Sequence, residues 1–118
     1  MSEDIEVLKH KAVHKGELCF EGLYIDKRKR IVVRKKNEID LTYTEFEILL
    51  LLAQNAGIVF SKEQIYEAVF GYDGTADDTA VTQHIKNIRA KLRTAGVAAP
   101  ETVLKTIWGV GYQWKSET

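Results

Sequence analysis

The sequence contains one cysteine and no apolar run longer than six residues, and each shortage excludes a class of protein. Cys19 alone cannot form an internal disulfide, so we expect a strand residue in a reducing compartment and a fold that depends on its hydrophobic core. The longest apolar run, residues 48–53, falls far short of the roughly 18 residues that a membrane span requires. The first four residues lack the basic start of a signal peptide. We therefore expect a cytoplasmic protein without a membrane segment.

The common motifs of enzymes and metal sites are also missing. There is no His-Glu-x-x-His sequence, no cysteine pair and no phosphate-binding loop ending in Gly-Lys-Ser/Thr. His10, His14 and His84 are too scattered to form a metal site. Gly109 and Gly111 lie within a predicted hairpin, where they do not form a dinucleotide-binding turn. We expect no enzymatic activity, no metal and no cofactor.

Charge is balanced overall but is unevenly distributed. The 118 residues include 17 basic and 17 acidic side chains, which argues against a protein that coats nucleic acid with its whole surface. Residues 61–78 contain one basic and five acidic side chains, for a net charge of −4. Residues 79–115 contain six basic and one acidic side chain, for a net charge of +5. The second segment is therefore the candidate for binding an anion.

Residues 1–16 read as a tail or linker remnant, residues 17–115 as one domain, and residues 116–118 as a second tail. Apolar residues alternate from residue 17 to residue 41, which predicts about four short antiparallel strands with Ile31 and Val33 on the apolar face of the third. Turns are expected at residues 26–30 and 36–38. The basic runs 27–30 and 34–36 are interpreted as solvated turns, with contact to a DNA backbone as the alternative.

From Thr42 onwards the apolar period changes from 2 to 3.6. Capping boxes begin at Thr42 and Ser61 and predict helices over residues 43–55 and 62–70, ended by glycines 57 and 71. Asp77 or Asp78 is positioned to cap a third helix that continues to about Ala95. The loop 97–100 and a β-branched, aromatic hairpin over residues 102–115 follow.

The third predicted helix has one apolar and one polar face. Val81, Ile85, Ile88 and Leu92 share a narrow stripe that is expected to be core. On the opposite face Gln83 and Asn87 are suited to adenine edges and Lys86 to guanine. The cations expected to neutralise phosphates on either side are Arg89, Lys91 and Arg93. Two preceding helices and a following hairpin favour DNA binding over a merely solvated face.

Four segments, residues 41–49, 59–65, 81–92 and 105–112, resemble the successive signatures of the OmpR/PhoB-type winged-helix output domain of bacterial response regulators. The resemblance extends over about residues 17–114. It implies an α+β fold, namely a winged helix-turn-helix with an N-terminal four-stranded antiparallel sheet, three helices and a C-terminal β-hairpin wing. It also implies sequence-specific binding of double-stranded DNA and regulation of transcription, with the helix at about residues 78–95 in the major groove.

The resemblance also assigns site residues by position. Those that contact DNA from the third helix would be Thr79, Gln83, His84, Lys86, Asn87 and Arg89, and those in or beside the wing would be Thr106, Trp108 and Tyr112. The loop Tyr72, Asp73, Gly74 and Thr75 would contact RNA polymerase. Thr79, Thr82 and Trp108 depart from the family, which often has Arg, Asp and Arg at these positions. The resemblance implies that the wing reaches the minor groove or the adjoining backbone. Trp108 is expected either to pack against the helices or to lie against sugars or bases. Because it replaces the Arg best suited to a narrow, electronegative minor groove, the third helix should carry more of the specificity.

The same resemblance bears on partners. We expect a monomer in free solution that pairs head-to-tail on direct repeats of DNA, with half-sites about 10–11 bp apart. A receiver domain would need roughly 120 further residues, so no Asp here is assigned as a phosphoacceptor, and the chain is either a fragment or a stand-alone output domain. The alternative is a winged-helix module that binds protein through the acidic stretch together with Tyr66, Phe70 and Tyr72.

Overall fold

The structure, a computed structural model, describes residues 16–20, 22–71 and 78–116. Almost all of the predicted tail and all of the predicted polymerase-contact loop lie outside these ranges. The chain divides into two compact units, Met1–Asp40 and Leu41–Thr118, which are described separately.

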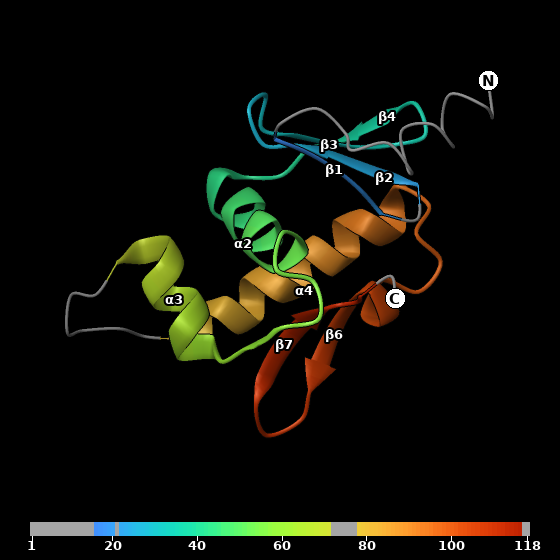
Figure 1. The fold of residues 1–118 in the computed structure, drawn as a ribbon. Helices are drawn as coiled ribbons and strands as arrows, with labels where there is room; N and C mark the ends of the chain where they lie inside the picture. The colour runs from blue at the N-terminus through green and yellow to red at the C-terminus, as the bar shows by residue number, and fades with distance from the viewer. Residues whose placement is uncertain (1–15, 21, 72–77, 117–118) are drawn as a thin grey trace. The chain divides into compact units, whose positions relative to one another are not determined.

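The first unit contains the expected four-stranded antiparallel sheet (Figure 1). Its strands, β1 (Glu17–Phe20), β2 (Leu23–Asp26), β3 (Ile31–Arg34) and β4 (Asn37–Ile39), follow in chain order. The register sets Val32 opposite Ile25 on one side and Ile39 on the other, and all three are buried. Ile31 and Val33 were expected on the apolar face of β3, but both are only half-buried and Val32 takes the buried face, so that expectation was wrong. Successive side chains of a strand point to opposite faces, so an assignment that is off by one residue exchanges the two faces.

The turns of this sheet also differ in part from the prediction. Asn37 and Glu38 belong to β4, and the chain turns one residue earlier, at Lys35, which has a φ of +57°. The preceding turn is held by Asp26, whose carboxylate accepts hydrogen bonds from the backbone N–H groups of Arg28 and Lys29, each at 2.9 Å. These bonds hold the pKa of Asp26 below its ordinary value.

The second unit contains α2 (Tyr43–Ala53), β5 (Val59–Phe60), α3 (Lys62–Phe70), α4 (Thr79–Thr94), α5 (Pro100–Val103), β6 (Leu104–Ile107) and β7 (Gly111–Trp114). Both predicted capping boxes are present: Thr42 exchanges hydrogen bonds with Glu45, and Ser61 does so with Gln64. Asp78 occupies the capping position of α4 but makes no side-chain capping hydrogen bond. α2 ends two residues earlier than predicted.

The core of this unit includes the predicted apolar stripe of α4. Val81, Ile85, Ile88 and Leu92 are all almost fully buried, so the predicted phase of this helix is confirmed. Trp114, whose burial was not predicted, is the largest fully buried side chain among the described residues and is 1% exposed. The polar face of α4 is therefore left on the outside.

Two features near the C-terminus were not predicted. Residues 100–103 form the short helix α5, with a proline in its first turn, in place of the predicted loop and start of a strand. β5 pairs with β7, so the hairpin belongs to a three-stranded sheet of order β5-β7-β6. A Cβ atom on Gly111 would lie 2.0 Å from the carbonyl oxygen of Phe60, so this close approach of β5 requires glycine.

Candidate nucleic-acid interface

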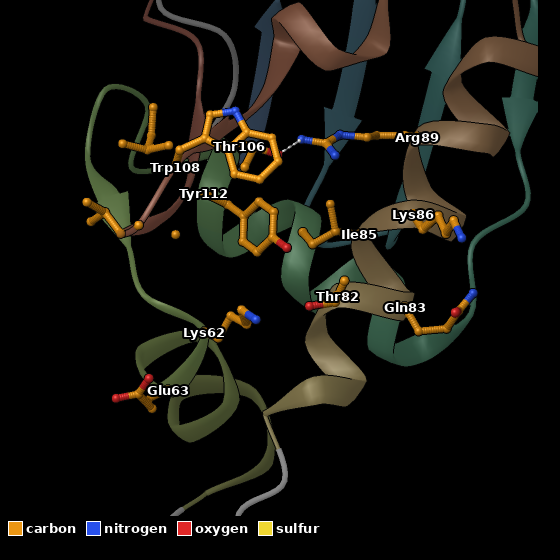
Figure 2. A pocket seen from close by; sticks show the side chains of 14 residues that line it. Lys62, Glu63, Thr82, Gln83, Ile85, Lys86, Arg89, Thr106, Trp108 and Tyr112 are labelled. Atoms are coloured by element: carbon orange, nitrogen blue, oxygen red, sulfur yellow. Dashed lines mark hydrogen bonds between the residues drawn. The ribbon is translucent and has the colours of Figure 1, made fainter.

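A groove of about 690 Å³ lies between α4, the N-terminal end of α3 and the β6–β7 hairpin, referred to below as the wing (Figure 2). Its lining residues are Lys62, Glu63, Thr82, Gln83, Ile85, Lys86, Arg89 and, from the wing, residues 106–112. The structure thus brings together the polar face of α4 and all three wing residues that the sequence predicted, Thr106, Trp108 and Tyr112.

The outer face of α4 displays two linked amides and a cation. Gln83 and Lys86 are exposed, and Asn87 is half-buried. Gln83 Nε2 donates a hydrogen bond to Asn87 Oδ1 at 3.0 Å, so the two amides form one connected unit. Gln83 Oε1 and Asn87 Nδ2 keep their hydrogen-bonding capacity, and base edges in a major groove present complementary donors and acceptors.

Arg89 has a different setting, because its side chain joins α4 to the wing. Its Nε and Nη2 atoms donate to the Leu104 carbonyl oxygen at 3.0 and 2.6 Å. Nη2 also donates to Thr106 Oγ1 at 2.8 Å (Figure 2). The guanidinium carbon lies 5.8 Å from the centre of the Tyr112 ring, close enough for a cation–π contact. Burial lowers the pKa of Arg89 from its ordinary value, yet a guanidinium remains charged in proteins.

The other basic residues expected to contact phosphates have internal partners too. Lys91 Nζ lies 2.6 Å from Glu45 Oε1, and Arg93 forms an exposed ion pair with Glu101. Burial raises the pKa of Glu45, but hydrogen bonds from Lys91 and Thr42 outweigh it and leave the pKa below its ordinary value. The net charge of residues 79–115 therefore overstates the cationic character of the α4 surface.

Lys62 is a candidate contact that sequence reasoning missed. The cationic side chains that line the groove are those of Lys62, Lys86 and Arg89. In the sequence Lys62 belongs to the acidic segment 61–78, so charge counting assigned it to the wrong surface. Its place directly after the capping residue Ser61, at the start of α3, was the available signal.

The wing presents its residues unequally. The side chain of Trp108 is 89% exposed, so the alternative in which it packs against the helices was wrong. Tyr112 is buried, and Thr106 is half-buried with its oxygen accepting from Arg89. The Thr106 hydroxyl proton still has a donor direction for an external acceptor.

Thr79 and His84 lie apart from the groove lining. Thr79 is exposed in the first turn of α4. His84 is half-buried, with its ring centre 6.3 Å from that of Phe70 in α3. Thr79 lies one turn before Gln83 on the same polar face of α4, whereas His84 lies at the edge of that face.

Comparisons with known proteins agree with this architecture. The family model described as "Transcriptional regulatory protein, C terminal" matches residues 36–114. The regulatory protein VanRB of Enterococcus faecalis is 50% identical over 76 residues, which are 64% of this chain and 31% of that protein. The transcriptional regulatory protein SpaR of Bacillus subtilis is 36% identical over 102 residues, which are 86% of this chain and 44% of that protein. The chain thus spans less than half the length of these relatives.

A similar solved structure contains DNA. The Klebsiella pneumoniae RstA DNA-binding domain in complex with the RstA box has a TM-score of 0.73 and 26% identity, covering 86% of this chain and 98% of that one. Among the described residues, no helix has the length and apolar character to cross a membrane. On the family match and the shared winged-helix architecture, the chain belongs to the OmpR/PhoB-type DNA-binding output domains of bacterial transcriptional response regulators.

Proposed function

We propose that this chain binds specific sites on double-stranded DNA through α4 in the major groove and thereby regulates transcription in the bacterial cytoplasm. The observation that carries the proposal is the polar face of α4, where exposed Gln83 and Lys86 adjoin Asn87 beside a groove lined by Lys62 and Arg89. Amides and a lysine on one face match base edges, whereas cations in an adjoining groove match a phosphate backbone.

The contacts divide into two groups by position. Lys86 and the linked pair Gln83 and Asn87 are proposed to read bases, because they point away from the buried stripe of α4. Backbone contacts are proposed for Lys62 and the Thr106 hydroxyl in the groove. Backbone contacts are also proposed for Thr79, His84 and Arg93, the last after release from Glu101.

Assembly and further partners extend the proposal. One short helix reads few base pairs, so two chains are proposed to bind head-to-tail on direct repeats about 10–11 bp apart, with a monomer in free solution. RNA polymerase is proposed to contact the loop of residues 72–75, which lies outside the described residues. A receiver domain is proposed as the regulatory partner, because the relatives are longer than the matched region.

A protein-binding role is the second candidate. Phe70 is 44% exposed and stacks on Tyr66 with ring centres 4.7 Å apart, which provides an apolar surface at the end of α3. Such a surface suits a protein partner as well as a regulator that meets polymerase. Salt distinguishes the two roles, because DNA contacts release counterions and weaken steeply between about 50 and 200 mM salt, whereas apolar contacts do not.

The test is selection from a pool of random-sequence duplexes, followed by fluorescence anisotropy of the recovered duplex and of a scrambled duplex across a salt series. Enrichment of a repeated motif and preference for it over the scrambled duplex are expected, with sedimentation showing one chain free and two on DNA. A pool that stays random after repeated rounds contradicts DNA reading. A tight dimer without DNA contradicts the assembly alone.

A further inference from the structure

The tip of the wing exposes two apolar side chains. Trp108 is 89% exposed and Val110 is 57% exposed, whereas Trp114 in the adjacent strand is 1% exposed. The tip is an ordered turn, since the Val110 N–H donates to the Ile107 carbonyl oxygen at 2.9 Å and Gly109 has a φ of +78°. A large aromatic ring held outside the core on an ordered turn is typical of a contact surface for a partner.

Continuity with the α4 surface indicates which partner this is. α4 and the wing form opposite walls of one groove, and Lys62, Lys86 and Arg89 give the groove its cationic lining. In B-DNA one sugar-phosphate backbone separates the major groove from the adjacent minor groove. When α4 occupies the major groove and that backbone occupies the cationic groove, the wing tip lies over the neighbouring minor groove.

The wing is also braced for contact. The Arg89 guanidinium donates to the Leu104 carbonyl oxygen and to Thr106 in β6, and β7 pairs with both β6 and β5. A side chain on such a support keeps its position when it meets a base stack. These contacts connect the wing to α4 and to β5, so they support the wing tip when it contacts DNA.

The chemistry of the tip determines what it recognises. An indole carries no positive charge, so it gains little from the strong negative potential of a narrow A-tract minor groove. Apolar side chains instead enter the minor groove as wedges that partly unstack a base step and kink the duplex. The deformation is easiest at the flexible steps TA and CA/TG.

We infer that Trp108, supported by Val110, inserts as an apolar wedge into the minor groove beside the site read by α4, and selects a flexible pyrimidine–purine step there. The inference rests on the proposed function and adds a second determinant of specificity. The duplex is bent at that step by about 20° or more, away from the wedge and towards the major groove.

The experiment repeats the selection from random-sequence duplexes with the unchanged chain, Trp108→Ala and Trp108→Arg. The unchanged chain should enrich TA or CA/TG at a fixed distance from the α4 motif. Trp108→Ala should still enrich the α4 motif but no longer the flexible step beside it. Its affinity for the duplex recovered with the unchanged chain should be reduced about tenfold. Trp108→Arg should enrich A-tracts at the same place.

Fluorescence gives a readout that does not depend on affinity. The chain has two tryptophans, and Trp108→Phe leaves the buried Trp114 as the reference. On the selected duplex the Trp108 signal should be quenched and shielded from acrylamide, and end-to-end energy transfer should report a bend that Trp108→Ala abolishes.

The outcomes separate the two proposals. The wedge is overturned if the unchanged chain enriches the α4 motif without a flexible step beside it. It is also overturned if Trp108→Ala loses the same affinity on duplexes with a flexible step as on duplexes with a rigid one. Either result leaves the major-groove proposal intact. Acrylamide access to Trp108 that is unchanged in the complex overturns the wedge as well. Failure of the unchanged chain to enrich any sequence overturns both.

Discussion

The guanidinium of Arg89 in α4 donates a hydrogen bond to the hydroxyl oxygen of Thr106 in β6 at 2.8 Å. The same side chain donates twice to the Leu104 carbonyl oxygen, so the candidate recognition helix and the wing share a three-bond connection. Arg89 was expected from the sequence to bind a phosphate. In the structure it is a positioning residue, and a phosphate contact has to be made in addition to these bonds.

The first prediction tests this connection with Arg89→Lys, which keeps the charge and loses the planar fork of donors. We expect the free energy of unfolding to fall by about 1–3 kcal/mol, because the Leu104 carbonyl loses two charge-assisted bonds. Chemical denaturation measures the loss. Arg93→Lys is the matched control, and its exposed ion pair with Glu101 predicts a change within about 0.5 kcal/mol.

DNA affinity distinguishes positioning from a direct phosphate contact. Arg89→Lys should weaken binding to the selected duplex more than to a scrambled one, because a misplaced wing loses the base step that Trp108 is inferred to select. A contrary outcome is that Arg89→Lys has the same stability and DNA affinity as the unchanged chain, while Arg89→Ala only lowers the slope of log affinity against log salt by about one. Arg89 would then act as a phosphate contact alone.

The second prediction concerns base reading by α4. Lys86→Ala and Asn87→Ala should each lose about 1–3 kcal/mol of binding free energy on the selected duplex and little on a scrambled one. Anisotropy on both duplexes measures the difference. Thr94→Ala, at the exposed end of the same helix, is the control, since its hydroxyl is bonded to the Ala90 carbonyl oxygen. Equal losses on both duplexes would show that this face does not read bases.

The third prediction follows from the hydrogen bond between Gln83 and Asn87. Because the two amides are hydrogen-bonded, Gln83→Ala should remove the contacts of Gln83 with DNA and also disturb the orientation of Asn87. A double-mutant cycle on the selected duplex should therefore give a coupling energy of about 0.5 kcal/mol or more. Strictly additive losses would mean that the amides bind DNA independently.

The fourth prediction concerns the packing of the wing against β5. Gly111→Ala should cost about 3 kcal/mol of stability, since its new methyl group would lie 2.0 Å from the Phe60 carbonyl oxygen. The clash is with the backbone of β5, so no side-chain rotation can relieve it. Gly109→Ala is the control: it meets nothing within 4 Å and has a φ of +78°, so strain of about 1 kcal/mol is expected. Thermal unfolding of the two variants gives the comparison, and a Gly111 variant no less stable than the Gly109 variant would contradict it.

The fifth prediction is a pH dependence carried by Glu45. Its folded-state pKa lies below the ordinary 4.5, so ionised Glu45 stabilises the fold above that pH, and the contribution is lost as pH falls through the lower folded value. Glu45→Gln keeps the capping geometry and loses the ion pair with Lys91. We expect the variant to be less stable by about 1–3 kcal/mol at pH 7.

That difference should shrink towards zero as the pH is lowered below 4.5. Denaturation at a series of pH values measures it. Glu101→Gln is the control, because both members of its ion pair with Arg93 are exposed and little change is expected at any pH. A difference between Glu45→Gln and the unchanged chain that stays constant down to pH 3 would rule out the ion pair as its source.

The sequence by itself determined the features that depend on neighbours along the chain. Thr42 with Glu45 and Ser61 with Gln64 mark helix starts because their hydrogen bonds close within one turn. Val81, Ile85, Ile88 and Leu92 establish which face of α4 is buried because helical periodicity is local. The polar face with Gln83, Lys86 and Asn87 follows from the same periodicity. The four signature segments added the family, and with it the wing.

Tertiary structure alone decided which charged side chains form ion pairs within the protein and which distant segments meet. Lys91 pairs with Glu45, which is 46 positions away in the sequence. Lys62 shares a groove with Arg89, although Lys62 belongs to the net-acidic segment 61–78 and Arg89 to the net-basic segment 79–115. Val32 replaced Ile31 and Val33 on the buried face because strand register depends on the partner strands. A residue's charge and size are properties of the sequence, but its partners depend on packing between segments that the chain order does not specify.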